Sequence, residues 1–189
     1  TSYTNALPTV TNESLNSIHF ADLASGWSVG NNGTILHTAN GGANWIDQSA
    51  ITHSELYSVL AINPSEAWVT GNMSDTLLHT VDAGLTWQVV SSTTTRSLSK
   101  IFFVNASVGW AVGDSGAIIK TVNGGNSWTA LISNVTQKLN SVYFVNPNEG
   151  WAVGDGGIII KTIDGGQTWN VQSIAFLDAL NDVQFISPL

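Results

Sequence analysis

The sequence predicts an all-β protein, a β-propeller of four-stranded antiparallel blades, because three series of residues repeat with one period. Each series advances by 41 or 42 residues, and two of them contain all eight tryptophans. The first is Trp27, Trp68, Trp110 and Trp151, and the second is Trp45, Trp87, Trp128 and Trp169. The third is Leu15, Leu56, Leu98, Leu139 and Leu180. A period of about 40–45 residues is typical of propeller blades, which bury their faces by stacking on neighbours.

The unit at residues 139–179 shows how four strands fit into one repeat. LNSVYF (139–144) alternates in character and predicts the first strand, and WAVG (151–154) predicts the second. IIIKT (158–162) predicts the third strand and TWNVQSI (168–174) the fourth, with glycine-rich tight turns between them. The third strand is apolar on both faces, which fits a sheet covered on both sides. No segment has a sustained helical period, so we expect no substantial helix.

The leucine register divides the chain into blades. Four complete blades are expected at residues 15–55, 56–97, 98–138 and 139–179, and residues 180–189 begin a fifth. Residues 1–14 are expected to hold the outer strand of a preceding blade. We therefore expect further blades, from the same longer chain or from another chain, to close the ring.

The composition argues against several classes of partner and of binding site. The chain has 189 residues with 43% hydrophobic ones, and five Lys+Arg against 13 Asp+Glu give a net charge of −8, which argues against nucleic acid. It has no apolar run long enough to span a membrane. It also has no cysteine, and His37 and His79 are repeat-equivalent residues too far apart to share a zinc ion. We expect no metal and no cofactor.

Five N-x-S/T sequons are present, at Asn12, Asn32, Asn72, Asn105 and Asn134. Together with the low charge and the absence of cysteine, they favour an extracytoplasmic or secreted location.

Each complete unit carries one turn of the form T-x-[DN]-x-G-x-x-W, at residues 38–45, 80–87, 121–128 and 162–169. This turn resembles the Asp-box of bacterial neuraminidase (BNR) repeats. With GWAVG upstream, residues 15–189 resemble propellers of the photosystem II assembly and stability factor family. That resemblance implies an assembly-factor role that holds a membrane-protein subunit. The box residues are Asn40 and Trp45, Asp82 and Trp87, Asn123 and Trp128, and Asp164 and Trp169.

The Asp-box residues are expected to be structural. A side-chain oxygen of Asp or Asn accepts backbone N–H groups within its own turn, and the tryptophan packs over that turn. The alternative is that the tryptophans form an exposed aromatic platform for sugars.

The sequence excludes one kind of catalysis, that of sialidases, and leaves another kind of glycoside hydrolysis open. Sialidases of this repeat class hold the substrate carboxylate with several arginines, whereas this chain has only Arg96. The open alternative is a fragment of an Asp-box propeller glycoside hydrolase, which needs two carboxylates about 5–10 Å apart. Asp114 and Asp155 are the pair to consider, although an Asp before a turn residue is ordinary.

The second repeat breaks the pattern on the rim opposite the Asp-boxes. Its turn at residues 72–75 is one residue longer than the equivalent turns, and the connection that follows holds the single arginine. A loop that departs from the repeat is the best candidate for a specific contact with a protein or glycan, although neutral drift is the alternative. Arg96 could pair with a ligand or with Asp75. The expected contacts are Asn72, Met73, Ser74, Asp75 and Arg96, flanked by Asp114 and Asp155.

Overall fold

The computed structural model describes residues 10–49, 52–72, 76–172 and 177–185 and contains four antiparallel sheets, each of four strands in chain order. The first sheet has β1 (Leu15–Phe20), β2 (Gly26–Gly30), β3 (Ile35–Thr38) and β4 (Ile46–Asp47). The second has β5 (Leu56–Asn63), β6 (Glu66–Gly71), β7 (Leu78–Thr80) and β8 (Gln88–Val89). The third has β9 (Leu98–Phe103), β10 (Gly109–Gly113), β11 (Ile118–Thr121) and β12 (Thr129–Leu131). The fourth has β13 (Leu139–Phe144), β14 (Gly150–Gly154), β15 (Ile159–Thr162) and β16 (Asn170–Gln172).

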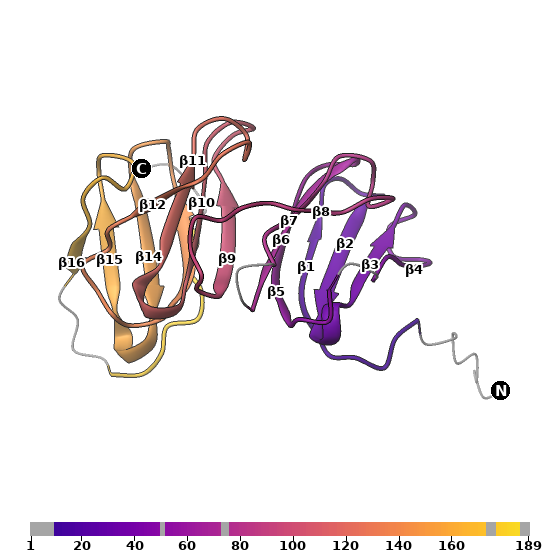
Figure 1. Cartoon of the computed structure of the whole chain (residues 1–189), viewed down its shortest axis with the longest axis horizontal. Coiled ribbons are helices and arrows are strands. Elements are labelled where there is room, and N and C mark those ends of the chain that lie inside the picture. Colours follow the sequence, from indigo (N-terminus) through magenta and orange to yellow (C-terminus); the bar gives the residue numbers. More distant parts are fainter. Residues whose placement is uncertain (1–9, 50–51, 73–75, 173–176, 186–189) are drawn as a thin grey trace.

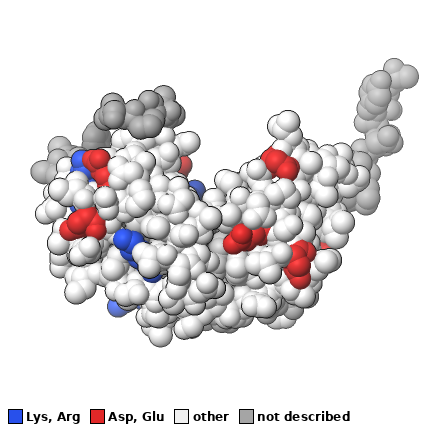
Figure 2. All heavy atoms as spheres, turned by 90° about the horizontal axis from the view of Figure 1, so that it is seen from above, with Lys and Arg blue, Asp and Glu red and all other residues white. Residues whose placement is uncertain are grey.

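The four sheets follow one another in chain order from right to left in Figure 1, as blades do around a propeller axis. The first strands β1, β5, β9 and β13 pack beside one another, which makes them the innermost strands. The last strands β4, β8, β12 and β16 each form one edge of their sheet. The result is an arc that is hollowed on one side, with sparse and scattered charged groups on the face shown in Figure 2.

Within the described ranges, the helical segments are three short 3-10 turns that join the second strand of a blade to the third. They are η1 (Asn31–Gly33), η2 (Asp114–Gly116) and η3 (Asp155–Gly157). The middle residue of each turn is left-handed, with φ of 53° at Asn32, 54° at Ser115 and 66° at Gly156. No helix in the part of the chain that the structure describes is long and apolar enough to cross a membrane.

The core lies between the blades, where aromatic side chains from two neighbours meet. Trp110 of β10 is fully buried and stacks on Phe144 of β13, with ring centroids 3.5 Å apart. Trp169 of the following Asp-box meets the edge of Phe144 at 5.9 Å. Trp68, Phe103 and Trp128 form the same trio one interface earlier. The repeated tryptophans therefore pack each of these blades against the next.

The interface between the first two blades departs from this pattern. Ala61 stands where the other repeats have phenylalanine, so Trp27 has no phenylalanine of the next blade to stack on. His37 of the same blade packs on Trp27, with ring centroids 4.6 Å apart. His37 is buried, and this burial lowers its pKa below the ordinary value. A repeat position that elsewhere has a partly exposed tip is therefore an interior position here.

The outer face of the first blade has the composition of a blade interface without a neighbour among the described residues. Leu15 and Ile18 are 48% and 57% exposed, whereas their equivalents Leu139 and Val142 are almost completely buried. The expected outer strand of a preceding blade falls largely on residues 1–9, which lie outside the described residues.

At the other end, residues 180–185 lie along β13 without forming a strand. The N–H of Leu180 bonds the carbonyl of Gly154 at 3.0 Å, and the Tyr143 hydroxyl donates to the carbonyl of Phe185 at 3.0 Å. The ring of Phe185 also packs on Trp151 at 4.4 Å. This segment takes the place that the first strand of a following blade would occupy. Residues 186–189 of the expected fifth unit are not among the described residues.

Candidate functional site

The Asp-box turns close on themselves through side-chain hydrogen bonds. In the fourth box, the Thr162 hydroxyl donates to Asp164 Oδ1 at 2.8 Å and accepts the N–H of Gly166 at 2.9 Å. Asp164 Oδ1 also accepts the N–H of Thr168 at 2.9 Å, and Asp164 Oδ2 accepts the Thr168 hydroxyl at 2.6 Å. The carboxylate is therefore engaged inside its own turn.

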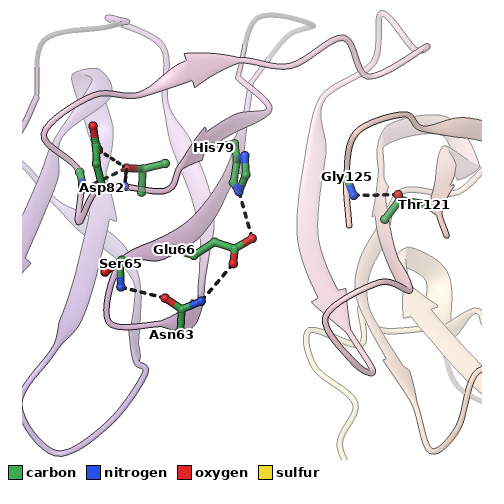
Figure 3. A network of polar contacts seen from close by, with 9 residues as sticks. Asn63, Ser65, Glu66, His79, Asp82, Thr121 and Gly125 are labelled. Carbon is green, nitrogen blue, oxygen red and sulfur yellow. Dashed lines mark hydrogen bonds and ion pairs between the residues drawn. The ribbon is translucent and has the colours of Figure 1, made fainter. Parts of the chain in front are cut away.

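The other three boxes repeat this geometry. Asp82 and the bond between Thr121 and Gly125 are drawn in Figure 3. Where asparagine replaces aspartate, its amide oxygen accepts the same backbone N–H of the turn. Asn40 accepts the N–H of Asn44 at 2.9 Å, and Asn123 accepts that of Ser127 at 3.0 Å. The substitution keeps the acceptor for the backbone N–H, removes the charge and replaces the second oxygen by a donor: the Asn123 side-chain N–H donates to the Ser127 hydroxyl at 2.9 Å.

The bonds from Thr168 lower the pKa of Asp164 to about 2. A carboxyl whose folded-state pKa lies below its ordinary value stabilises the fold above that ordinary value, and the contribution is lost as the pH falls toward the folded-state pKa. We expect the unfolding free energy of the wild type to fall more steeply between about pH 5 and about pH 2 than that of Asp164→Asn. Urea titrations at the two pH values measure this difference. Equal losses in both proteins would show that the ionised box does not stabilise the fold.

The box tryptophans are not a surface platform in three of the four blades. Trp87, Trp128 and Trp169 are buried, the last two against Phe103 and Phe144 of the same blades. Trp45 is half-buried and meets Phe20 edge-on at 6.0 Å. Its larger exposure belongs to the first blade, whose outer face has no neighbouring blade in the described structure.

In two blades, a side chain that is paired with a glutamate covers the ring of the tryptophan in the second strand. His79 stacks on Trp68 with ring centroids 3.9 Å apart, and its Nε2 lies 3.2 Å from Glu66 Oε1. Asn63 in turn donates to Glu66 Oε2 at 3.0 Å (Figure 3).

The fourth blade has the same arrangement, with a lysine in place of the histidine. Lys161 lies over Trp151 and 2.7 Å from Glu149. Glu66 and Glu149 are repeat-equivalent, which is the signal by which the sequence could have revealed these pairs. Within the described residues, no three His, Asp or Glu side chains gather as metal ligands would.

The structure places the break in the second repeat against the connection that holds Arg96. The Asn72 side-chain oxygen accepts the hydroxyl of Ser97 at 3.0 Å, and the Asn72 N–H bonds the carbonyl of Glu55 at 2.8 Å. Two loops of one rim are thus joined directly beside the arginine. Met73, Ser74 and Asp75 fall outside the described residues, so their predicted contacts stay predictions.

The two flanking aspartates have different neighbours: Asp114 faces the connection into the following blade, and Asp155 faces the first strand of its own blade. Asp114 Oδ1 lies 3.6 Å from Lys138 Nζ, and Asp155 Oδ1 accepts the side-chain N–H of Asn140 at 2.9 Å. Burial, a hydrogen bond to Glu55 and the charges of Glu55 and Asp114 together raise the pKa of Tyr57 on the same rim. Each aspartate therefore has a positioning partner of its own.

Arg96 lies at the edge of a surface cavity of about 400 Å3, which we call the rim pocket. Its wall includes Thr94 from the same connection and Ser115 from the left-handed turn of the third blade. The apolar part consists of Ile118, Leu131, Ile132 and Val135. Arg96 is exposed and takes part in none of the ion pairs found among the described residues. The pocket therefore combines an available guanidinium with an apolar surface.

The repeated sequence of this chain matches the model of one known family. The sequence model described as photosynthesis system II assembly factor YCF48 matches residues 3–95 and 85–176. This chain belongs to the YCF48 family. The resemblance inferred from the Asp-boxes is confirmed, and membership in a family of assembly factors agrees with a binding propeller that is not an enzyme. No curated protein matches the sequence significantly.

Solved structures confirm the propeller fold. YCF48 bound to a D1 peptide has a TM-score of 0.69 and 23% identity, over 87% of this chain and 55% of that one. YCF48 from Cyanidioschyzon merolae has the same TM-score and identity, over 93% of this chain and 61% of that one. An ancestral GH74 enzyme has a TM-score of 0.67 and 18% identity, over 83% of this chain and 24% of that one. The chain thus spans between a half and two thirds of the two YCF48 structures.

Proposed function

We propose that this chain binds an extended segment of a partner protein in the rim pocket and so acts as an assembly-factor propeller. The observation that carries the proposal is the rim pocket itself, where the single arginine borders Leu131, Ile132 and Val135. A guanidinium can hold a carboxylate in a bidentate pair, and apolar side chains beside it can receive a neighbouring residue of the same segment. Ile132 is 74% exposed, which leaves it available for such a contact.

The backbone beside the rim pocket supports an extended ligand. The outermost strand β12 (Thr129–Leu131) ends at the pocket, and one of its edges pairs with no strand among the described residues. Such an edge presents N–H and C=O groups that an extended peptide can pair with, while adjacent pockets select its side chains. The net charge of −8 disfavours a strongly acidic partner, so we propose a segment with one carboxylate among apolar residues.

The test uses the D1 peptide, because YCF48 has been solved with such a peptide bound. Fluorescence anisotropy with a labelled D1 peptide should show saturable binding that Arg96→Ala weakens about tenfold or more, the loss expected of one charge-assisted pair. The matched control is Asn126→Ala, an exposed residue in the turn of the third Asp-box, which should bind as the wild type does.

Two outcomes would contradict the proposal. Unchanged binding by Arg96→Ala together with loss in the Asn126→Ala control would place the ligand on the Asp-box rim. Absence of peptide binding together with saturable binding on a glycan array would favour a glycan as the ligand.

We also propose that the protein works outside the cytoplasm. Four sequon asparagines, Asn12, Asn32, Asn105 and Asn134, are exposed and would be accessible in such a location. Adding protease outside the cytoplasmic membrane of host cells that carry the tagged chain tests this proposal. Full protection of the chain by an intact cytoplasmic membrane would contradict it.

A further inference from the structure

The hollow side of the arc contains a second cavity, distinct from the rim pocket. It has a volume of about 280 Å3 and lies on the innermost strands of all four blades and on residues 182–184. Five side chains of mixed chemistry line it: His19, Lys100, Phe102, Tyr143 and Asp182. We call it the inner-strand cavity.

The free edges of the innermost strands are covered by side chains of the preceding blade. In an antiparallel pair, successive N–H groups point alternately toward the partner strand and away from it. The N–H of Val59 points away from β6 and is accepted by Ser17 Oγ of the preceding blade at 3.2 Å. The N–H of Val183 is accepted in the same way by Ser141 Oγ at 3.4 Å. In these two places, Ser17 and Ser141 therefore accept an N–H group at the free edge.

Lys100 breaks this arrangement in the third blade. It occupies the repeat position of Ser17, Ser58 and Ser141, opposite the edge of β13. The N–H of Val145 bonds Glu149 O across to β14, so the alternation directs the N–H of Val142 toward the free edge. An ammonium group has only donors and cannot accept that N–H. Two donors, Lys100 Nζ and the Val142 N–H, therefore belong to the same cavity.

Lys100 is incompletely paired by the groups that surround it. Its Nζ lies 3.9 Å from Asp182 Oδ1, beyond hydrogen-bonding distance, and both side chains are substantially exposed. The same Asp182 oxygen already accepts the Ser141 hydroxyl at 2.7 Å. A carboxylate therefore already lies near the Lys100 ammonium, but it does not form a hydrogen bond with it.

His19 supplies a third donor. Its Nδ1 accepts the N–H of Ala61 at 3.2 Å, which places the proton of the neutral ring on Nε2. Burial, and secondly the charge of Lys100, lower the pKa of His19, so the neutral ring prevails near pH 7. Phe102 and Tyr143, with ring centroids 4.9 Å apart, add an aromatic wall to the cavity.

We propose that the inner-strand cavity binds a small organic carboxylate with a flat apolar body. The ammonium of Lys100 and the N–H of Val142 hold the carboxylate, and the rings of Phe102 and Tyr143 contact the apolar body. This site needs neither Arg96 nor the rim pocket, so it stands or falls independently of the proposed protein-binding function.

The probe for this site is benzoate, with benzamide as its uncharged counterpart, observed by backbone amide NMR. Benzoate should shift the Val142 amide saturably, and benzamide should not. Lys100→Ser restores the residue that three other repeats carry, so it keeps the fold and should weaken benzoate binding about tenfold or more, as expected for loss of a charge-assisted bond. Lys161→Met removes a lysine that lies over Trp151 instead and should bind benzoate as the wild type does.

Three results would overturn the proposal. Equal shifts with benzamide would show that the carboxylate is not recognised. Undiminished binding by Lys100→Ser would show that the lysine is not the anchor. Shifts that grow without saturation would show unspecific binding. The dispersion of the amide spectrum reports in the same experiment that each variant is folded.

Discussion

Replacing Trp110 by alanine is expected to lower the unfolding free energy by about 3–5 kcal/mol, the usual loss when a large aromatic side chain leaves a core. The ring is fully buried, stacks on Phe144 at 3.5 Å, and donates its Nε1–H to the carbonyl of Gly165 at 3.2 Å. All of these contacts join the third blade to the fourth. The melting temperature should therefore fall by about 6–20 °C in a domain of this size.

The matched control for this change is Trp45→Ala. Trp45 belongs to the other tryptophan series and is only half-buried, so its removal should destabilise the protein clearly less. Calorimetry of the three proteins measures the difference. Equal melting temperatures for the wild type and Trp110→Ala would mean that interblade stacking does not hold the blades together.

Gly125→Ala is the second change with a large expected effect. Gly125 has φ of 83°, and a Cβ there would lie 2.2 Å from the Trp68 ring, which is itself fully buried between blades. Left-handed strain and a clash with a ring that cannot move act together, so we expect a loss of about 3 kcal/mol or more.

Gly156→Ala separates the two causes. Gly156 has φ of 66°, yet a Cβ there would meet nothing within 4 Å. The equivalent residues Asn32 and Ser115 adopt the same conformation with side chains present. We expect a loss of only about 1 kcal/mol, and urea unfolding measures both variants. A similar loss for both glycines would show that contact with Trp68 is unimportant.

The sequence predicts the architecture well because the repeat reports on stacking. Trp110 and Leu139 recur every 41 or 42 residues since each must fill the same interface, so the period reveals the blade. The Asp-box hydrogen bonds follow from residue type, because Asp and Asn both offer an acceptor to their own turn. These inferences depend on local chemistry that every repeat shares.

Contacts between strands and between blades were harder to predict. The hydrogen bond from the N–H of Ala61 to His19 joins two blades and links residues 42 positions apart. The partnership of Glu66 with His79 likewise requires the register between adjacent strands. A sequence without that register shows each residue but not its partner.

The candidate site shows the same division. The sequence singles out Arg96 because it is the single arginine and follows a repeat turn that breaks the pattern, and its part in binding stays a prediction. The apolar wall of the rim pocket was not found, because Ile132 and Val135 lie in a connection that the sequence does not place beside the arginine. Folding brings residues 94–96 next to residues 115–118 and 130–136.

The most direct test of the proposed function is hydrogen–deuterium exchange with and without the peptide of the binding experiment. Binding in the rim pocket predicts slower exchange at residues 94–97 and 131–136, with the Asp-box turns at 40–44, 82–86 and 123–127 unchanged. Slower exchange confined to those turns, with the rim pocket unaffected, would contradict the account and place the binding surface on the opposite face.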